Sequence, residues 1–222
     1  ISIPTAGFLG GGFHQGHVQA LMSLSSLAED DGKIPSANLV GEKTLETERD
    51  EHFNEVRRLL AAIGIPICTR FVCRTSVGEI SRLSRGGCNI LRDPSMEGVG
   101  RFLEERFGTP FISSFPIGSR GTIQFLEEVG RVFSLDVSGA IAEEEARQAR
   151  IFHEFRSLRG KRVRFCDPFG NRTDSEVCRE VASAAGMSVH PEGYPVPVPE
   201  PFPVGTEGIR RLLYRWRRAC RA

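Results

Sequence analysis

The sequence lacks the features that would assign it to a membrane, secretory or nucleic-acid-binding class. It has no run of about 18 apolar residues, so no transmembrane helix is predicted. Its first residues show neither the basic region nor the long apolar region of a signal peptide. The formal net charge is only +1, which leaves the molecule without a strong field for nucleic acid or a membrane surface. We therefore expect a cytoplasmic protein that binds neither.

Cysteine is present, but not in the spacing of a common metal or redox motif. The six cysteines form no CxxC pair, which argues against a zinc ribbon or a thioredoxin-like site. We expect reduced thiols. Cys88 and Cys166 fall in predicted strands, where a small buried hydrophobic residue is the simplest interpretation. The sequence leaves the identity of any bound metal unknown.

What the sequence does contain is a regular alternation of strands and helices. With 222 residues, 40% of them hydrophobic, the chain can bury a real core. The apolar spacing predicts strands at 37–41, 65–72, 88–91 and 110–112, and helices at 48–63, 76–85, 95–107 and 121–133. Ser76 and Ser95 are the expected N-caps of two of these helices. Such alternation predicts right-handed crossovers and parallel sheets, and therefore an α/β fold of Rossmann-like three-layer units.

The same pattern divides the chain into four predicted segments. Residues 1–35 read as the end of a truncated first domain, with a glycine-rich loop and a helix, because the chain begins like the end of a buried strand. Residues 36–135 form a Rossmann-like parallel domain, and residues 136–158 form a linking helix. Residues 159–222 form a second, partial Rossmann-like domain with a strand at 160–166, a helix at 174–185 and a strand at 187–189.

The end of the chain changes character. Residues 191–203 hold six prolines, which exclude a helix or a central strand there. Residues 205–222 are expected to be helical and carry six arginines. Because no nucleic-acid signature accompanies them, we favour a solvated or subunit-facing helix. A short echo, residues 115–122 and 202–209, opens a predicted helix each time and suggests a duplicated unit.

The most unusual candidate for chemistry is the glycine-rich stretch at residues 7–17. Its five glycines let backbone approach a ligand closely, and the helix that follows favours anionic groups at its N-terminus. His14 and His17 add groups that transfer protons or bind metals near neutral pH. Gly10, Gly12 and Gly16 do not have the spacing of a dinucleotide fingerprint. A tight turn with solvent-facing histidines is an equally good interpretation of the residues alone.

Three further loops follow predicted strands, where ligands bind in open parallel sheets. Arg172, in the loop at 167–173, could pair with a carboxylate or a phosphate, although an ordinary strand-to-helix turn explains it as well. Glu42 and Lys43 are most simply a surface ion pair. Arg92 and Asp93 are most simply a local pair or neighbours of a helix cap.

A succession of short motifs runs in order along the chain, and its most specific stretch is residues 102–111 (FLEERFGTPF). The other segments are 4–10, 16–17, 38–42, 64–67, 71–72, 75–76, 79–80, 89–91, 115–118, 121–122, 160–163 and 186–189. In this order the motifs resemble the nitrogenase component 1-like oxidoreductases. This family includes nitrogenase, its cofactor-assembly scaffolds, dark-operative protochlorophyllide reductase and the nickel-tetrapyrrole reductive cyclase.

The resemblance implies an oxidoreductase subunit that receives electrons from an ATP-dependent iron–sulfur reductase and reduces a bound substrate or cofactor precursor, with a tetrapyrrole as one candidate. It implies a homologous component 1 subunit as partner, in a homo- or hetero-oligomer. It also implies an iron–sulfur cluster whose ligands lie outside this fragment, with a tetrapyrrole or metallocluster as a second group. His17 matches a histidine that lines the family's cofactor cavity, and we expect it to be catalytic. The residues expected to bind the cofactor are Gly10, Gly12, Gly16, His14, Asp93 and Arg172.

The sequence departs from the family pattern at one informative place. The position of the cysteine that binds the nitrogenase cofactor falls near Arg92 and Asp93, and Cys88 lies at the other end of that strand. This departure argues against a nitrogenase alpha chain. It keeps two alternatives open: a non-catalytic scaffold or partner subunit for metallocofactor assembly, and a small-molecule-binding α/β module without a redox role.

Overall fold

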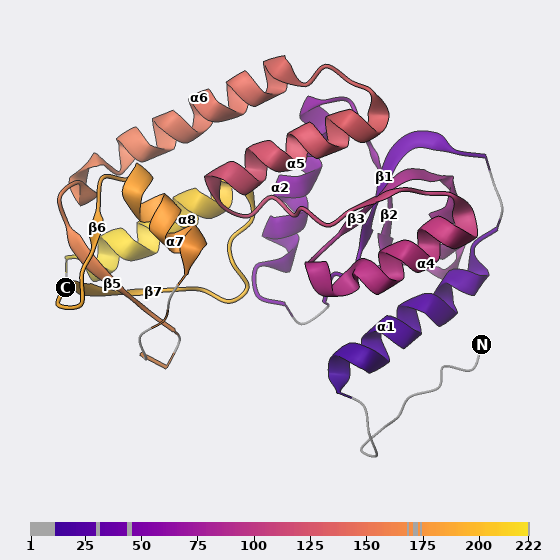
Figure 1. The fold of residues 1–222 in the computed structure, drawn as a ribbon, viewed down its shortest axis with the longest axis horizontal. Helices are drawn as coiled ribbons and strands as arrows, with labels where there is room; N and C mark the ends of the chain where they lie inside the picture. The colour runs from indigo at the N-terminus through magenta and orange to yellow at the C-terminus, as the bar shows by residue number, and fades with distance from the viewer. Residues whose placement is uncertain are drawn as a thin grey trace. The chain divides into compact units, whose positions relative to one another are not determined.

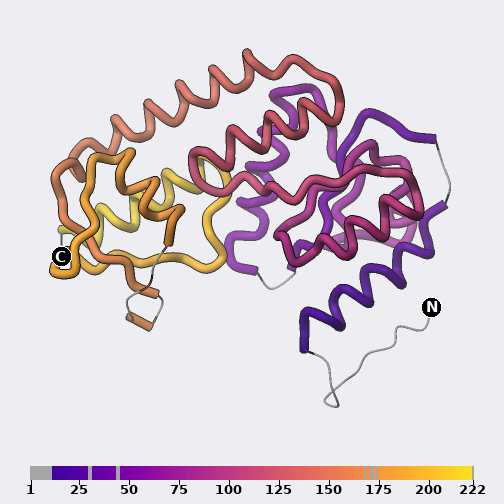
Figure 2. The backbone as a smooth tube through the Cα atoms, viewed as in Figure 1, coloured from indigo at the N-terminus to yellow at the C-terminus, as the bar shows by residue number. Residues whose placement is uncertain are grey.

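The computed structural model describes residues 12–29, 32–43, 46–167, 169–170, 173 and 175–221 (Figures 1 and 2). These residues divide into two compact units. The first comprises the described residues up to Glu46, with Leu60–Phe115 and Glu128–Leu135; the second comprises Thr47–Leu59, Pro116–Glu127 and the described residues from Asp136 onward. The four segments predicted from the sequence stay a prediction, because compact units and evolutionary domains are different divisions of a chain.

The first unit is built on a parallel sheet, as the sequence predicted. Its strands are β1 (Ile34–Val40), β2 (Ile67–Phe71), β3 (Gly86–Leu91) and β4 (Phe111–Ile112), in the order β2-β1-β3-β4. Each neighbouring pair is parallel. Its helices are α1 (Phe13–Leu24), α3 (Val77–Ile80) and α4 (Glu97–Phe107), with the 3₁₀ helices η2 (Ser25–Leu27), η3 (Leu83–Arg85) and η4 (Pro94–Met96). Helices α2 (Arg49–Ala62) and α5 (Gly118–Phe133) contribute residues to both units.

One face of this sheet is covered by α1, α3 and α4 (Figure 1). Val40, Phe71 and Leu91 project from the three longest strands into a cluster with Leu21 of α1 and Leu103 of α4, and all five side chains are fully buried. Side chains alternate between faces along a strand, so Leu39 and Ile90 point to the opposite face. Both faces of β1 and β3 are therefore buried, as expected for strands at the centre of a parallel sheet, and their buried polar side chains Asn38 and Asn89 share a hydrogen bond of 2.9 Å.

The predicted helix caps are half right. Ser76 does cap α3, in a capping box with Glu79, as its position indicated. The expectation that Ser95 caps the next helix is wrong. Asp93 is the capping residue, because its carboxylate accepts the Ser95 N–H at 2.9 Å and begins η4, from which α4 continues. Gly108 ends α4 in the left-handed conformation, as predicted.

The start of α1 corrects a second prediction. The glycine-rich stretch was expected to remain a loop as far as residue 17. Instead α1 begins at Phe13, so His14, Gly16 and His17 all lie in helix. The helix therefore begins about one turn earlier than predicted, and its apolar residues from Val18 onward pack against the core. The expected strand end at residues 1–4 and the loop at 7–11 lie outside the described residues.

The second unit contains another parallel sheet. Its strands β5 (Arg162–Cys166), β6 (Ser188–Val189) and β7 (Tyr194–Pro197) stand in the order β6-β5-β7. The helices are α6 (Ser138–Glu154), α7 (Glu176–Ala184) and α8 (Gly205–Ala219), with the 3₁₀ helix η5 (Arg156–Leu158). Its core joins all of these helices to β5 around the buried Phe155, Phe165 and Trp216. None of the helices in the described part of the chain has the length and apolarity needed to cross a lipid bilayer.

The proline-rich segment forms the edge strand β7. The Val198 N–H donates to the Cys166 carbonyl of β5 at 2.7 Å, so the residue after the strand still faces inward. Pro195, Pro197 and Pro199 occupy the alternate positions, at which an N–H group would point away from β5. Because proline has no N–H group, this outer side of the strand lacks donors at these positions. The outward carbonyl of Pro197 accepts the indole N–H of Trp216 at 2.9 Å. This edge therefore offers little to another strand, which protects it against aggregation.

The two copies of the sequence echo lie together. Ile117 and Val204 form an antiparallel bridge, and the Gly205 N–H donates to the Pro116 carbonyl at 2.7 Å. Each copy begins a helix, and each helix start is bound by a carboxylate from elsewhere in the unit. Glu180 accepts N–H groups at the start of α5, and Glu55 accepts the Glu207 N–H of α8. The repeated sequence therefore corresponds to the starts of two helices, α5 and α8, that lie next to each other.

A buried charge network joins α2, α6 and α8 within the second unit. The Arg58 guanidinium binds the carboxylates of Glu55 and Glu144 at 2.7–2.9 Å, and both carboxylates are almost fully buried. Glu144 also accepts the hydroxyl of Thr206. Burial alone raises the pKa of Glu55, but the hydrogen bonds and charge of Arg58 outweigh it, so the pKa lies below its ordinary 4.5.

We predict that Gly205→Ala destabilises the protein by roughly 2–4 kcal/mol. Gly205 has a φ of +64°, and a Cβ atom there would lie 2.2 Å from Cγ of Glu55, whose carboxylate is fixed by Arg58. The matched control is Gly139→Ala in α6, where a Cβ atom meets nothing within 4 Å. Urea denaturation of both variants measures the difference, and equal stabilities would contradict the packing described here.

We also predict an acid-dependent loss of stability from Glu55. Because its folded-state pKa is lowered, its stabilising contribution is complete above the ordinary pKa of 4.5 and is lost as the pH falls through the lowered value. Glu55→Gln should cost about 2 kcal/mol at pH 7 and flatten the acid dependence. The exposed neighbour substitution Glu145→Gln should change neither. Urea midpoints across a pH series test this, and parallel curves for wild type and Glu55→Gln would contradict it.

Candidate functional site

The candidate site lies at the carboxyl edge of the first sheet, where the loops after β1 and β3 leave side by side. Val40 pairs with Leu91, and the Arg92 N–H donates to the Val40 carbonyl at 2.9 Å. Lys43 and Asp93 therefore follow neighbouring strands at the same edge. Ligands of open parallel sheets bind at this edge, because the strand ends and the helix starts meet there.

Gly41 is the residue that lets the β1 loop turn close to the next element. Its φ is +89°, and a Cβ atom at this position would lie 2.6 Å from Cγ of Met96. A larger residue would therefore be strained in its backbone and would displace a buried side chain. The path of the following residues, Glu42 and Lys43, depends on this glycine.

Two buried arginine–glutamate pairs hold the loops in place. Arg70 binds Glu42 through two hydrogen bonds of 2.9 Å, and the glutamate is only 6% exposed. Arg92 donates to both carboxylate oxygens of Glu46 through its Nε and Nη2 groups, and its guanidinium carbon lies 4.7 Å from the ring centre of Phe115. Such forked pairs fix geometry more firmly than a lysine pair does. Both oxygens of each carboxylate are bonded to an arginine, so these glutamates serve to hold the loops.

Lys43 is the charged group at this edge that is held most loosely. Its Nζ lies 3.8 Å from Oδ2 of Asp93, beyond hydrogen-bond distance, and 45% of its side chain is exposed. Asp93 uses its other oxygen to cap η4. The lysine therefore keeps hydrogen-bonding capacity for a ligand, while the aspartate is largely committed to structure.

His17 is the titratable group with the most perturbed surroundings in this region. Its Nδ1 is buried and has no hydrogen-bond partner among the described residues. Burial, the Lys43 charge and His14 lower the pKa of His17 below 6.5, and Asp93 opposes them. The imidazole is therefore neutral at pH 7, where it can accept a proton or, once protonated, act as a stronger acid than a free histidine.

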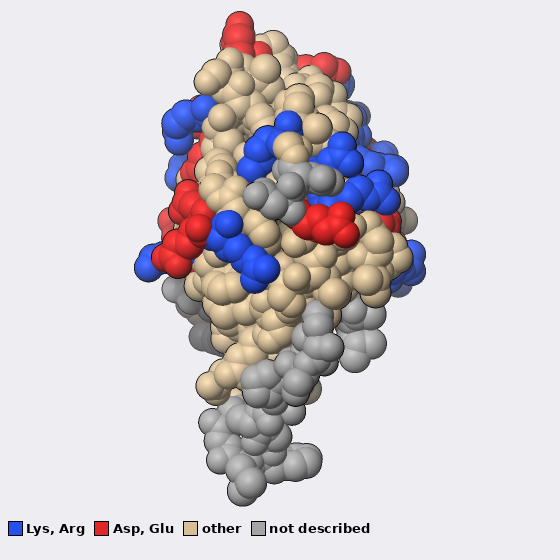
Figure 3. All heavy atoms as spheres, turned by 90° about the vertical axis from the view of Figure 1, so that its right-hand side faces the viewer, with Lys and Arg blue, Asp and Glu red and all other residues tan. Residues whose placement is uncertain are grey.

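Helix α1 presents this histidine on an uncharged surface. The helix contains no Asp, Glu, Lys or Arg, so apart from His14 on the same helix the charges that act on His17, Lys43 and Asp93, come from the loops. In Figure 3 the lower part of the described surface, the level at which α1 lies in Figure 1, is tan below mixed blue and red groups. Phe13 stacks on His17 with ring centres 5.9 Å apart and is 79% exposed. An aromatic face beside a neutral imidazole suits a flat, apolar ligand.

The structure brings together some of the predicted site residues. His14, His17 and Asp93 are close enough to interact electrostatically. Gly12 and Gly16 lie at the start of α1, where added Cβ atoms would meet nothing within 4 Å, so space is open beside them. Gly10 and Arg172 lie outside the described residues. The expected pairing of Glu42 with Lys43 is wrong, because Glu42 binds Arg70 and Lys43 faces Asp93.

The residues that the structure describes do not fit an iron–sulfur cluster. No three His, Cys, Asp or Glu side chains among them converge as a metal site. Burial raises the pKa of the Cys88 thiol to about 12 and that of Cys178 to about 11, so both stay protonated, whereas a metal-binding cysteine is a thiolate.

Sequence reasoning missed the two arginine–glutamate pairs. Arg70 and Glu46 were not singled out, because Arg70 lies in β2 while its partner follows β1, and Glu46 follows β1 while its partner follows β3. Both pairings therefore depend on strand order. The available signal was the presence of charged residues at or just after the ends of three strands that are otherwise apolar. Opposite charges at such neighbouring positions indicate pairs once the sheet order is known.

Comparison with known proteins gives a consistent family. A family model described as "Nitrogenase component 1 type Oxidoreductase" matches residues 1–166. A light-independent protochlorophyllide reductase subunit of Halorhodospira halophila (strain DSM 244 / SL1) is 32% identical over 157 residues, covering 69% of this chain and 29% of that protein. The corresponding subunit of Methylobacterium sp. (strain 4-46) is 30% identical over 154 residues, covering 68% and 30%. The chain thus spans less than a third of the length of these relatives.

Solved structures show the same fold. The nitrogenase Cp1 structure at pH 5 superposes with a TM-score of 0.62 at 20% identity, covering 86% of this chain and 41% of that one. The structure of nitrogenase Cp1 at pH 6.5 gives a TM-score of 0.61 at 20% identity, covering 81% and 36%. This confirms the predicted α/β class with parallel sheets and its likeness to nitrogenase component 1.

We predict that Lys43→Met raises the pKa of His17, because it removes a nearby positive charge. Asp93→Asn should lower it. The pH dependence of His17 modification by diethyl pyrocarbonate, quantified by peptide mass spectrometry, reports the fraction of neutral imidazole. Lys161→Met, in the second unit, is the control and should leave the midpoint unchanged. If the pH midpoint of His17 modification is the same in wild type, Lys43→Met and Asp93→Asn, the three groups do not share one site.

Proposed function

Because the chain belongs to the nitrogenase component 1 type oxidoreductases, we propose that it forms part of a reductase subunit that acts on a tetrapyrrole. In this proposal the subunit receives electrons from an ATP-dependent iron–sulfur reductase and works with a homologous component 1 subunit. The observation that carries the proposal is the aligned similarity to light-independent protochlorophyllide reductase over more than 150 residues. The uncharged surface around His17 and Phe13 supports a flat, apolar substrate.

His17 is the proposed proton donor. Reducing a carbon–carbon double bond takes two electrons and two protons, and a histidine with a lowered pKa delivers one such proton readily. Its buried Nδ1, free of any described partner, is the atom available for this transfer. His14, Gly12, Gly16 and Asp93 are proposed to shape the substrate site, together with Gly10 and Arg172, on sequence grounds.

The electron-transfer cluster is proposed to be bound by parts of the complex outside the described residues. This follows from the misfit of the described thiols, which are dispersed and held protonated by burial. The residues described here then supply the shape of the site, its exclusion of water and a proton, and none of them carries electrons. A cytoplasmic location is proposed with the same function.

A non-catalytic scaffold or partner subunit is the second candidate. At the place where a cofactor-binding cysteine was expected, Arg92 is committed to Glu46 and Asp93 to the cap of η4. A protein of this kind would hold a tetrapyrrole or metallocluster without turning it over. A small-molecule-binding module without redox chemistry is the third.

The full-length protein, purified without oxygen, separates these functions. Protochlorophyllide binding followed by absorbance, and its reduction when the partner subunit, an iron–sulfur reductase and ATP are added, are expected for the first. Binding of protochlorophyllide or a metallocluster without reduction would favour the scaffold. A protein that stays colourless after iron–sulfur reconstitution and binds no tetrapyrrole would contradict both and favour the third.

We predict that His17→Ala lowers kcat for the reduction about 100-fold, because a positioned proton donor is lost. Substrate binding and thermal unfolding should change little, since His17 is only partly buried and its side chain makes no hydrogen bond through Nδ1 among the described residues. His153→Ala is the control, because this histidine is exposed on α6 and its ring lies at hydrogen-bond distance from Arg156. Unchanged turnover in His17→Ala would remove His17 from the site.

A further inference from the structure

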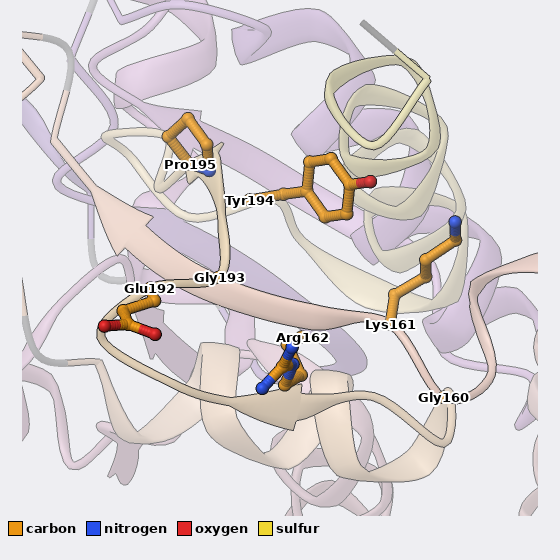
Figure 4. Close-up of a pocket in the computed structure, with 7 residues that line it drawn as sticks. All are labelled: Gly160, Lys161, Arg162, Glu192, Gly193, Tyr194 and Pro195. Atoms are coloured by element: carbon orange, nitrogen blue, oxygen red, sulfur yellow. The ribbon is translucent and has the colours of Figure 1, made fainter.

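A hollow lies at the amino edge of the second sheet, and none of the residues that line it has a role in the proposed reaction. It encloses about 500 Å³ and is lined by Gly160, Lys161, Arg162, Glu192, Gly193, Tyr194 and Pro195 (Figure 4). Lys161 and Arg162 come from the start of β5, and Tyr194 and Pro195 from the start of β7. The last four of these residues lie beyond the family match, which ends at residue 166.

The side chains of the hollow are available for a ligand. Arg162 and the carboxylate of Glu192 form no ion pair with any residue in the described part of the chain. Lys161 places its Nζ 5.6 Å from the ring centre of Tyr194, and that ring is 43% exposed. In Figure 4 Lys161 and Tyr194 lie toward one end, Glu192 lies at the other, and Arg162 lies between them. The hollow carries two cations and one anion, and thus a net positive charge.

The backbone of the hollow is closed to a phosphate group. A phosphate site in a loop needs free N–H groups that point at the ligand. Here the N–H of Gly160 donates to Gly186, that of Lys161 to Leu158, and that of Gly193 to His190. The Glu192 N–H donates to Nδ1 of His190. Recognition in this hollow therefore depends on side chains alone.

The floor of the hollow is fixed rather than adaptable. The chain crosses the start of β5 at Gly193, where an added Cβ atom would lie 2.5 Å from the backbone nitrogen of Val163. The lining holds no His, Cys or Ser that could act as a nucleophile or a proton carrier near neutral pH. A rigid, open, mixed-charge surface with tyrosine and arginine has the composition of a protein-binding patch.

We propose that this hollow docks an acidic polypeptide segment of a partner protein. A carboxylate of the segment pairs with the Arg162 fork and the Lys161 ammonium, and an apolar group packs on the Tyr194 ring. Glu192 accepts from a donor or cation that follows in the segment, which fixes its direction. The partners to be tested, the component 1 partner subunit and the iron–sulfur reductase, rest on the proposed function.

Binding of the full-length protein to each of these two partners tests the proposal, with sedimentation velocity and titration calorimetry as the readouts. We expect Lys161→Glu/Arg162→Glu to weaken binding to one partner at least tenfold at low salt and to abolish its salt dependence. Tyr194→Ala should also weaken it, whereas Tyr194→Phe should retain it. Arg101→Glu/Arg131→Glu, an equal charge change at two exposed positions outside the hollow, is the control. Matching thermal unfolding curves establish that the variants are folded.

A photo-cross-linker at position 194 then identifies what lies in the hollow. A cross-link to an Asp- or Glu-rich segment of the partner supports the proposal. Unchanged affinities in all hollow variants, a cross-link to a basic segment or to a second copy of this chain, or displacement of the partner by inorganic phosphate would overturn it. Turnover is measured separately, so absent reduction with intact hollow-dependent binding would count against the proposed function alone.

Discussion

Two backbone hydrogen bonds at the end of β1 determine what the first unit can do. The Gly41 N–H donates to the Phe71 carbonyl at 3.1 Å, and the Arg92 N–H donates to the Val40 carbonyl at 2.9 Å. They hold the ends of three parallel strands in register, so that the charged residues after each strand leave at one edge. A shift of one residue in the register of a strand would direct each of these side chains to the opposite face of the sheet, and they would no longer lie together.

The charged and titratable residues at this edge fall into two groups, those that hold the loops in place and those that remain able to interact with a ligand. The two buried arginine–glutamate pairs are compensated and anchor the loops, since removing either partner would leave an uncompensated charge. Lys43 and His17 are not anchored in this way, so their side chains can interact with a ligand. The second unit follows the same logic: Arg58 holds Glu55 and Glu144, while Arg162 and Glu192 at the sheet's amino edge remain uncommitted among the described residues.

Much of the fold could be predicted from the sequence, because hydrophobic periodicity and helix-stop glycines are local signals. The parallel sheet followed from them. The prolines of residues 191–203 excluded a helix or a central strand, but the edge strand β7 within them was not predicted. The cap at Asp93 was missed because serine and aspartate are equally common N-cap residues, and only the folded backbone shows which of Asp93 and Ser95 occupies the cap position. The partners of Glu42 and Lys43 could not be predicted, because they lie on other strands and the order of strands is not a local property. His17 was singled out from the sequence as a group that can transfer a proton, and the family resemblance added the expectation that it is catalytic, which stays a prediction.

The most direct test of the proposed site is a cryo-electron microscopy structure of the full-length protein with its partner subunit and bound protochlorophyllide. We expect the ring to lie against Phe13, with Nδ1 of His17 directed at it and Lys43 at its edge. A ring bound elsewhere, with His17 turned away and the loops after β1 and β3 on different edges, would contradict the site and the parallel register on which it depends.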